Sequence, residues 1–180
     1  MFAKLKICKD MIRFGFIGTG RISDWVYKGA SEDPRIRITA ICSRTKEAAQ
    51  AFIDRHPEIE GAKIYTSVAD MAQDPEIDAV YIGTPNQTHH GYCLTLLNAG
   101  KHVICDKPIC TDLTELDEIE KLSEEKNLQV CCMLDLRYLP QSVRAKELLS
   151  SGMLGEVRNI TFNGQHPLSY GKRPSWYFER

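Results

Sequence analysis

Short, almost wholly apolar runs alternate along the first 135 residues with longer stretches of mixed polarity. Apolar runs of this kind are typical of parallel strands that are buried on both faces. The stretches between them repeat apolar residues at the three-to-four-residue spacing of a helix. The pattern predicts strands at 12–17, 36–42, 63–65, 79–82, 102–105 and 128–134. It predicts helices at 21–30, 46–55, 87–98, 112–126 and 141–149, and a brief helix that begins at Ser67.

Strands that alternate with helices of about 10–15 residues predict right-handed parallel crossovers. The expected fold class is therefore α/β, with a doubly wound parallel sheet. Residues 156–163 differ, because polar positions interrupt this apolar run and no helix follows it. They predict the start of a second α/β domain with a mostly antiparallel sheet. We divide the chain into an N-terminal extension, the parallel-sheet domain and an incomplete second domain, at 1–10, 11–135 and 136–180.

The composition excludes several classes of protein. The 180 residues carry a net charge of −1 and are 43% hydrophobic, which is ordinary for a globular domain and argues against a nucleic-acid partner. No apolar run approaches the roughly 20 residues of a membrane helix. The first ten residues lack a signal-peptide core, and Met11 offers a second plausible start. We therefore expect a cytoplasmic protein.

The cysteines give no pattern of a metal or disulfide site. Seven are present, an odd number, and no two have the Cys-x-x-Cys spacing. Several lie in strand-like runs, which favours buried, reduced thiols over a zinc site or a disulfide framework. The sequence therefore predicts no metal site.

A glycine turn joins the first predicted strand to the first predicted helix, in the stretch MIRFGFIGTGRIS at 11–23. Glycines let the backbone approach a ligand closely, and the N–H groups at a helix N-terminus bind phosphate. The third glycine of the dinucleotide-binding pattern is Ser23 here. An ordinary glycine turn is the alternative, and Arg21 in that case is a solvated surface side chain. The expected phosphate-binding residues are Gly18, Thr19, Gly20, Arg21 and Ile22.

Two further motifs accompany this turn. One is Gly-Thr-Pro-Asn-Gln-Thr-His at 83–89, and the other is Gly-Lys-His-Val-Ile-Cys-Asp-Lys-Pro at 100–108. Together with Arg137-Tyr138-x-Pro140 and the stretch SGMLGEV at 151–157, they resemble the Gfo/Idh/MocA oxidoreductases, the glucose–fructose oxidoreductase and inositol dehydrogenase family. The resemblance implies an NAD(P)-binding Rossmann domain at 11–135, followed by a substrate and dimerisation domain. Members of that family are longer and have a later Asp/His motif, so the chain resembles one truncated after its N-terminal domain.

The resemblance implies hydride transfer between a nicotinamide dinucleotide and a secondary alcohol or aldehyde, such as a sugar, cyclitol or related small polyol. The end of the second predicted strand indicates which dinucleotide. NAD-binding proteins place a carboxylate there, whereas residues 36–46 contain none and offer Ser43, Arg44, Thr45 and Lys46. Two cations and two hydroxyls suit a 2′-phosphate, so we predict NADP over NAD. The alternative is that Lys46 merely starts a surface helix.

The resemblance also implies contacts on the nicotinamide side of the cofactor and at the domain junction. The residues that match are Thr84, Pro85, Asn86, His89, Asp106, Arg137, Arg173 and Trp176. For His89 itself, however, a structural histidine that caps or packs against the helix is the favoured interpretation. Asp106 stands where the family has glutamate, and is one methylene shorter.

Lys107 is the candidate catalytic residue. At the end of a strand, its ammonium group can bind a substrate hydroxyl, stabilise the alkoxide that forms as hydride leaves, or help to move the proton. Pro108 favours an extended backbone before it, so the lysine side chain can point into the cleft, where burial without a counter-charge would lower its pKa. A surface Asp–Lys pair is the alternative at this position.

Two other classes of function stay open for the whole chain. One is a non-catalytic dinucleotide-binding sensor or degenerate protein, and the other is an assembly module. The partners expected for the leading hypothesis are a nicotinamide dinucleotide and a small-molecule substrate, with no nucleic acid and no membrane. A homo-oligomer formed through the second-domain sheet is a further option.

Overall fold

The computed structural model describes residues 10–164. The strands are β1 (Ile12–Ile17), β2 (Ile36–Cys42), β3 (Lys63–Tyr65), β4 (Ala79–Ile82), β5 (His102–Cys105) and β6 (Val130–Cys132). The α-helices are α1 (Arg21–Ser31), α2 (Lys46–Arg55), α3 (Val68–Ala72), α4 (His89–Asn98), α5 (Leu113–Lys126) and α6 (Pro140–Ser150). Two 3₁₀ turns, η1 (Asn86–Thr88) and η2 (Asp135–Tyr138), complete the elements. The first five strands have the predicted bounds, while β6 is shorter than predicted.

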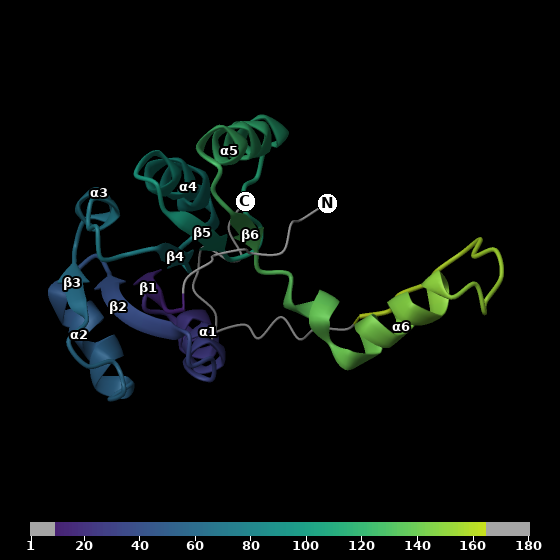
Figure 1. Ribbon diagram of the computed structural model, residues 1–180, viewed down its shortest axis with the longest axis horizontal. Helices are drawn as coiled ribbons and strands as arrows, with labels where there is room; N and C mark the ends of the chain where they lie inside the picture. The colour runs from purple at the N-terminus through teal and green to yellow at the C-terminus, as the bar shows by residue number, and fades with distance from the viewer. Residues whose placement is uncertain (1–9, 165–180) are drawn as a thin grey trace. The chain divides into compact units, whose positions relative to one another are not determined.

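All six strands form one parallel sheet with the order β3-β2-β1-β4-β5-β6 (Figure 1). The predicted doubly wound parallel sheet is therefore confirmed. The strand order reverses at β1, which has β2 on one side and β4 on the other. In open α/β sheets this switch point, at the carboxyl ends of the strands, is where ligands bind.

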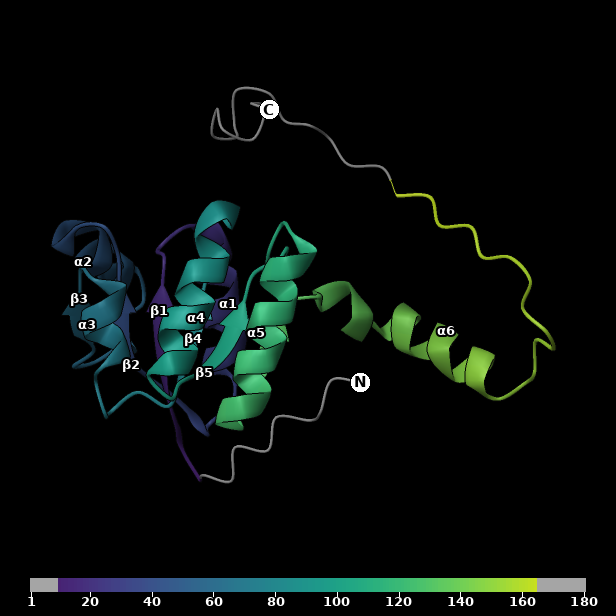
Figure 2. The same cartoon turned by 90° about the horizontal axis from the view of Figure 1, so that it is seen from above.

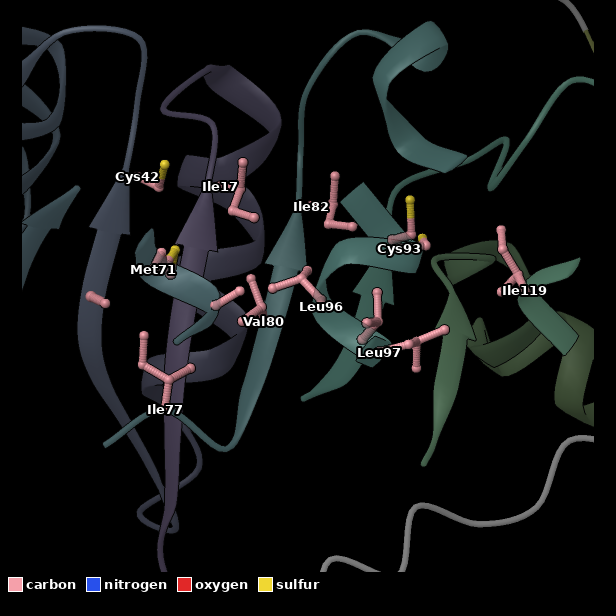
Figure 3. Close-up of a cluster of buried hydrophobic side chains, with 14 residues drawn as sticks. Ile17, Cys42, Met71, Ile77, Val80, Ile82, Cys93, Leu96, Leu97 and Ile119 are labelled. Atoms are coloured by element: carbon pink, nitrogen blue, oxygen red, sulfur yellow. The ribbon is translucent and has the colours of Figure 1, made fainter. Parts of the chain in front are cut away.

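Helices cover both faces of the sheet, as Figures 1 and 2 show. Because side chains alternate along a strand, β1 sends Phe14 and Phe16 to one face and Ile17 to the other. Helices α1 and α2 pack on the phenylalanine face, whereas α3, α4 and α5 pack on the opposite one. Figure 3 shows the second core, in which Cys93, Leu96 and Leu97 of α4 lie against the strands. Both faces of the central strands are therefore buried, which explains their continuous apolar sequences.

Polar residues just before the helices set where these begin. Ser67 accepts a hydrogen bond from the Asp70 N–H at 3.3 Å, and Asp112 accepts one from the Thr114 N–H at 2.7 Å. The predicted starts of α3 and α5 are thus confirmed by capping bonds. The predicted helix from 87 differs, because the turn η1 intervenes and α4 begins only at His89.

The chain divides into two compact units, one ending at Asp135 and the other starting at Leu136. The second unit contains α6, which has Pro140 at its first turn. The strand predicted at 156–163 is wrong, because these residues have no regular secondary structure and no antiparallel sheet occurs among residues 10–164. An isolated strand is not stable without a pairing partner. Ile160 and Phe162 remain 70% and 86% exposed, so this apolar stretch has no core of its own within residues 136–164.

Candidate functional site

The glycine turn after β1 touches the loop after β4. Gly18 has φ of +98°, and a Cβ atom built there would lie 2.3 Å from the Gly83 carbonyl oxygen. Both backbones are also tied to neighbouring strands, because the Gly18 N–H donates to the Cys42 oxygen at 2.9 Å and the Gly83 N–H donates to the Ile17 oxygen at 2.8 Å. Only glycine fits at position 18, for both its conformation and its close approach. The predicted turn therefore lies at the switch point of the sheet.

Helix α1 begins at this turn without a side-chain cap. Gly20 is its N-cap residue, and a Cβ atom there would meet nothing within 4 Å. The first backbone N–H groups of α1 are therefore not used by a capping side chain, and a helix N-terminus attracts anions. Arg21 and Ile22 are both exposed here, and the Arg21 guanidinium lies 5.7 Å from the centre of the Trp25 ring.

The end of β2 lies beside the glycine turn. The hydroxyl oxygens of Thr19 and Ser43 are 3.3 Å apart, which joins the two loops directly. Arg44 and Lys46 follow as exposed cations, and neither makes an ion pair within residues 10–164. The Thr45 hydroxyl accepts a hydrogen bond from the Ala48 N–H at 3.2 Å and so caps α2. Because that hydroxyl can still donate, capping leaves it able to bind an anion.

Arg55 is a residue of this region that the sequence did not reveal. Its guanidinium donates to the Thr19 carbonyl at 3.2 Å and to the Asp24 carboxylate at 3.1 Å. His56 also contacts Asp24, with 2.8 Å between Nε2 and Oδ1. These contacts hold the glycine turn from α2 and offset the negative charge in the first turn of α1. No short-range signal could have found them, since Arg55 and Thr19 are 36 residues apart.

The loop after β4 is held by its own hydroxyls. The Thr88 hydroxyl donates to the Pro85 carbonyl at 2.7 Å and lies 2.7 Å from the Thr84 hydroxyl. Pro85 is exposed and Asn86 is half-buried, so both lie at the surface of the carboxyl edge.

His89 does not face that surface. It is 0% exposed, and its ring nitrogens lie 2.8 Å from the Thr84 oxygen and 2.7 Å from the Pro108 oxygen. The expected cofactor contact from His89 is therefore replaced by a contact between two loops. A ring enclosed in this way offers no surface to a ligand.

The loop after β5 carries Asp106 and Lys107. The Asp106 carboxylate accepts a hydrogen bond from the Lys107 N–H at 2.8 Å, and the Lys107–Pro108 peptide is cis. Since β5 pairs with β4, this loop lies next to the one that holds Thr84. Among the described residues the Lys107 side chain is exposed, so burial does not act on its ammonium group, and the expectation that it points into an enclosed cleft is not met.

Ser23 fills the place of the third glycine without opening the packing. It is 0% exposed, and a Cβ atom at Gly83 would lie 2.9 Å from its hydroxyl and 2.7 Å from that of Tyr81. Burial raises the pKa of Tyr81, so its hydroxyl stays neutral here. The small side chain of Ser23 therefore fits between α1 and β4, as the close contact at this position requires.

Comparison with known families decides the assignment. The profile of the GFO_IDH_MocA family, an oxidoreductase family with an NAD-binding Rossmann fold, matches residues 12–134. The chain belongs to this family. The resemblance carried by the motifs at 11–23, 83–89 and 100–108 is therefore confirmed.

Several proteins that this chain resembles are named as dehydrogenases or reductases. The scyllo-inositol 2-dehydrogenase (NADP(+)) IolU of Bacillus subtilis (strain 168) is 31% identical over 84% of this chain and 44% of its own length. The 3-ketoreductase KijD10 of Actinomadura kijaniata, solved with NADP and TDP-benzene, has a TM-score of 0.72 at 28% identity, over 82% of this chain and 45% of that one. The scyllo-inositol dehydrogenase of Lactobacillus casei, solved with NAD(H) and scyllo-inositol, has a TM-score of 0.74 at 26% identity, over 81% and 43%. The chain thus spans less than half the length of these relatives.

Three of the predicted cofactor-binding residues fall outside the first unit of the chain. Arg137 is exposed in η2, in the second unit, and Arg173 and Trp176 lie outside the described residues. Within residues 10–164, the cysteines are free thiols, and no group of three or more His, Cys, Asp or Glu side chains could hold a metal ion. No helix in this part of the chain is long and apolar enough to cross a membrane.

Proposed function

We propose that this chain is the cofactor-binding part of an NADP-dependent oxidoreductase. The observation that carries the proposal is the meeting of the uncapped start of α1 with the end of β2, where the Thr19 and Ser43 hydroxyls lie 3.3 Å apart. A dinucleotide laid across this edge would place its pyrophosphate at the N-terminus of α1 and its adenosine ribose near Ser43. The names of the relatives, which include NADP-dependent enzymes, support the proposal.

The preference for NADP rests on Arg44. Its guanidinium is exposed beside Ser43 and, among the described residues, has no carboxylate partner, so it can form charge-assisted hydrogen bonds with a 2′-phosphate. We expect the protein to bind NADPH at least about tenfold more tightly than NADH. Fluorescence titration of both nucleotides measures this ratio.

The matched variants for that titration are Arg44→Ala and Arg37→Ala. Arg37 is an exposed arginine of the same strand region, but it lies near the amino end of β2. Arg44→Ala should weaken NADPH binding about tenfold and leave NADH binding unchanged, whereas Arg37→Ala should change neither. A wild-type preference for NADH, or an equal loss of both nucleotides in Arg44→Ala, would contradict the NADP assignment.

The proposed reaction is hydride transfer between the nicotinamide ring and a secondary alcohol or aldehyde of a sugar, cyclitol or related polyol. The bound dinucleotide supplies the hydride donor or acceptor. Lys107, at the end of β5, would bind the substrate oxygen, and its ammonium group would stabilise the negative charge that develops there or exchange the proton. Asp106 holds the backbone of Lys107 through the 2.8 Å bond to its N–H.

Replacement of Lys107 tests the chemical step in the complete protein. Lys107→Ala should leave NADPH affinity within about twofold and lower turnover by a factor of about 10² to 10⁴, the usual contribution of a positioned acid–base group. Lys121→Ala is the control, because Lys121 is also an exposed lysine, 78% exposed on α5. Unchanged turnover in Lys107→Ala would remove the catalytic role.

A non-catalytic dinucleotide-binding protein is the second candidate function. The exposure of Lys107 favours it, because no group among the described residues orients the ammonium. Such a protein would bind NADPH and show no turnover with any sugar or cyclitol. The first candidate function, the oxidoreductase, entails three further properties of the complete protein. These are an antiparallel substrate domain, a homo-oligomer formed through that domain and a cytoplasmic location. Sedimentation of the complete protein tests the oligomer.

A further inference from the structure

Both ring nitrogens of His89 face backbone carbonyl oxygens at hydrogen-bond distance. Its Nδ1 lies 2.7 Å from the Pro108 carbonyl oxygen, and its Nε2 lies 2.8 Å from the Thr84 carbonyl oxygen. A carbonyl oxygen only accepts hydrogen bonds, so both ring nitrogens must donate. The neutral ring has one N–H group, and its other nitrogen would point a lone pair at an oxygen. Only the imidazolium, with two N–H groups, satisfies both contacts.

Because His89 is buried, its protonation state affects the stability of the fold. His89 is 0% exposed, so a nitrogen that faced a carbonyl without a proton could not turn to water instead. An unpaired buried acceptor destabilises a fold, whereas hydrogen bonds from a charged donor are about twice as strong as neutral ones. Two carbonyl dipoles aimed at the ring therefore offset part of the cost of burying its charge.

We propose that His89 is a buried imidazolium that clamps the loop after β4 to the loop after β5. One bond holds Thr84, next to Pro85 and Asn86, and the other holds Pro108, next to Lys107. On the proposed function, these are the loops that flank the nicotinamide ring. His89 is then a positioning residue, because it fixes the position of the Lys107 backbone relative to Thr84.

Nuclear magnetic resonance of the ¹⁵N-labelled full chain tests the charge directly, without any ligand. His102 provides an internal reference, because its Nδ1 accepts a hydrogen bond from the Gln129 N–H at 2.9 Å and so carries no proton. At pH 7 we expect both nitrogens of His89 to be protonated, and Nδ1 of His102 to be bare. A spectrum in which one ring nitrogen of His89 is unprotonated would overturn the proposal.

Two variants test the positioning role. His90 is the matched control, because it is the next residue and bonds instead to the Glu118 carboxylate at 2.9 Å. His89→Gln should weaken NADPH binding about tenfold but leave adenosine 2′,5′-bisphosphate, which lacks the nicotinamide half, bound as in the wild type. His90→Gln should change neither affinity.

The outcomes separate the two proposals. Equal weakening of both ligands in His89→Gln, or weakening of neither, would overturn the positioning role. If the wild-type protein binds neither ligand, the proposed function fails, and the nuclear magnetic resonance experiment still decides the charge of His89. That experiment uses the wild-type chain, so it also decides the question if His89→Gln does not fold.

Discussion

The two edges of the parallel sheet differ in which of their charged residues are paired. At the amino edge, the Arg13 guanidinium donates to both oxygens of Asp78, at 2.8 and 3.1 Å. Lys101 is 7% exposed, and its ammonium group donates to the Asp74 and Ile77 carbonyls at 2.6 and 2.9 Å. These bonds join the chain before β4 and β5 to the start of β1. Charge at this edge therefore holds the strands in register.

At the carboxyl edge, Arg55 is paired with Asp24, but three other cations have no such partners among residues 10–164. Arg44, Lys46 and Lys107 are exposed, and the loops are joined by backbone contacts, hydroxyls, Arg55 and the His89 ring. Unpaired cations contribute little to stability but remain able to bind an anionic ligand. On the proposed function, stability and binding would be divided between the two ends of the same strands, so variants at each end should affect different measurements.

The largest effect is expected from Lys101→Met at the amino edge. This change keeps much of the apolar volume but leaves two carbonyl acceptors without their donor. We expect the free energy of unfolding to fall by about 3 kcal/mol, with dinucleotide affinity of the folded protein unchanged. Urea denaturation measures the loss. Lys121→Met, at an exposed lysine, should change stability by less than about 0.5 kcal/mol. A similar small change in Lys101→Met would show that this edge does not carry the stability.

Gly18→Ala should have the largest effect at the carboxyl edge. The new Cβ atom would lie 2.3 Å from the Gly83 oxygen at a φ of +98°, so the loop must shift. We expect NADPH affinity to fall about 100-fold, the order of effect that a misplaced binding loop produces. Gly29→Ala is the control, because a Cβ atom there meets nothing within 4 Å. It should keep full affinity and gain about 0.5–1 kcal/mol of stability from better helix propensity. An affinity loss below threefold in Gly18→Ala would contradict the proposed pyrophosphate site.

The sequence predicted the parallel sheet because its signals are local. The strands at 12–17 and 79–82 are continuous apolar runs, and Ser67 and Asp112 precede their helices as caps do. The glycine turn could be predicted for the same reason, since a strand, two glycines and a helix follow one another directly. The strand at 156–163 failed because an apolar run becomes a strand only when another strand pairs with it.

The contacts that arrange the candidate site could not be predicted in this way. His89 bonds to Thr84 five residues before it and to Pro108 nineteen residues after it, and Arg55 reaches Thr19 across 36 residues. Neither pairing follows from a repeat, a spacing or a propensity, because each depends on how β4, β5 and the helices are brought together. The motifs drew attention to His89 and Lys107 and favoured a structural histidine, but they did not indicate which carbonyls enclose its ring or that the lysine is exposed.

Acid should weaken the amino edge through Asp74. Burial would raise the pKa of this carboxyl group, but hydrogen bonds from Tyr65, the Glu76 N–H and Lys63 outweigh burial and hold it at about 2. Because its pKa is lower in the folded state, the stability it contributes is complete above about pH 4 and is lost as the pH falls toward 2.

Urea denaturation between pH 5 and 2 checks the contribution of Asp74. Asp74→Asn should lower stability at pH 5 by roughly 1–2 kcal/mol and flatten the dependence on pH in this range. The control is Asp54→Asn, an exposed carboxylate on α2 that bonds only to Gln50 among the described residues. It should keep the wild-type slope. An unchanged slope in Asp74→Asn would mean that other carboxylates are responsible.

The smallest effect concerns Thr45, the carboxyl-edge residue whose hydroxyl also serves stability. It accepts the Ala48 N–H at 3.2 Å as the cap of α2. Thr45→Ala should therefore lower the free energy of unfolding by about 1 kcal/mol, whereas Thr45→Ser, which keeps the hydroxyl, should lower it by less than about 0.5 kcal/mol. Urea denaturation of the two variants separates a lost cap from lost packing by the methyl group. If Thr45→Ala and Thr45→Ser lower the free energy of unfolding equally, the hydroxyl does not stabilise α2. Thr45 would then contribute only to binding, like the exposed cations of the carboxyl edge.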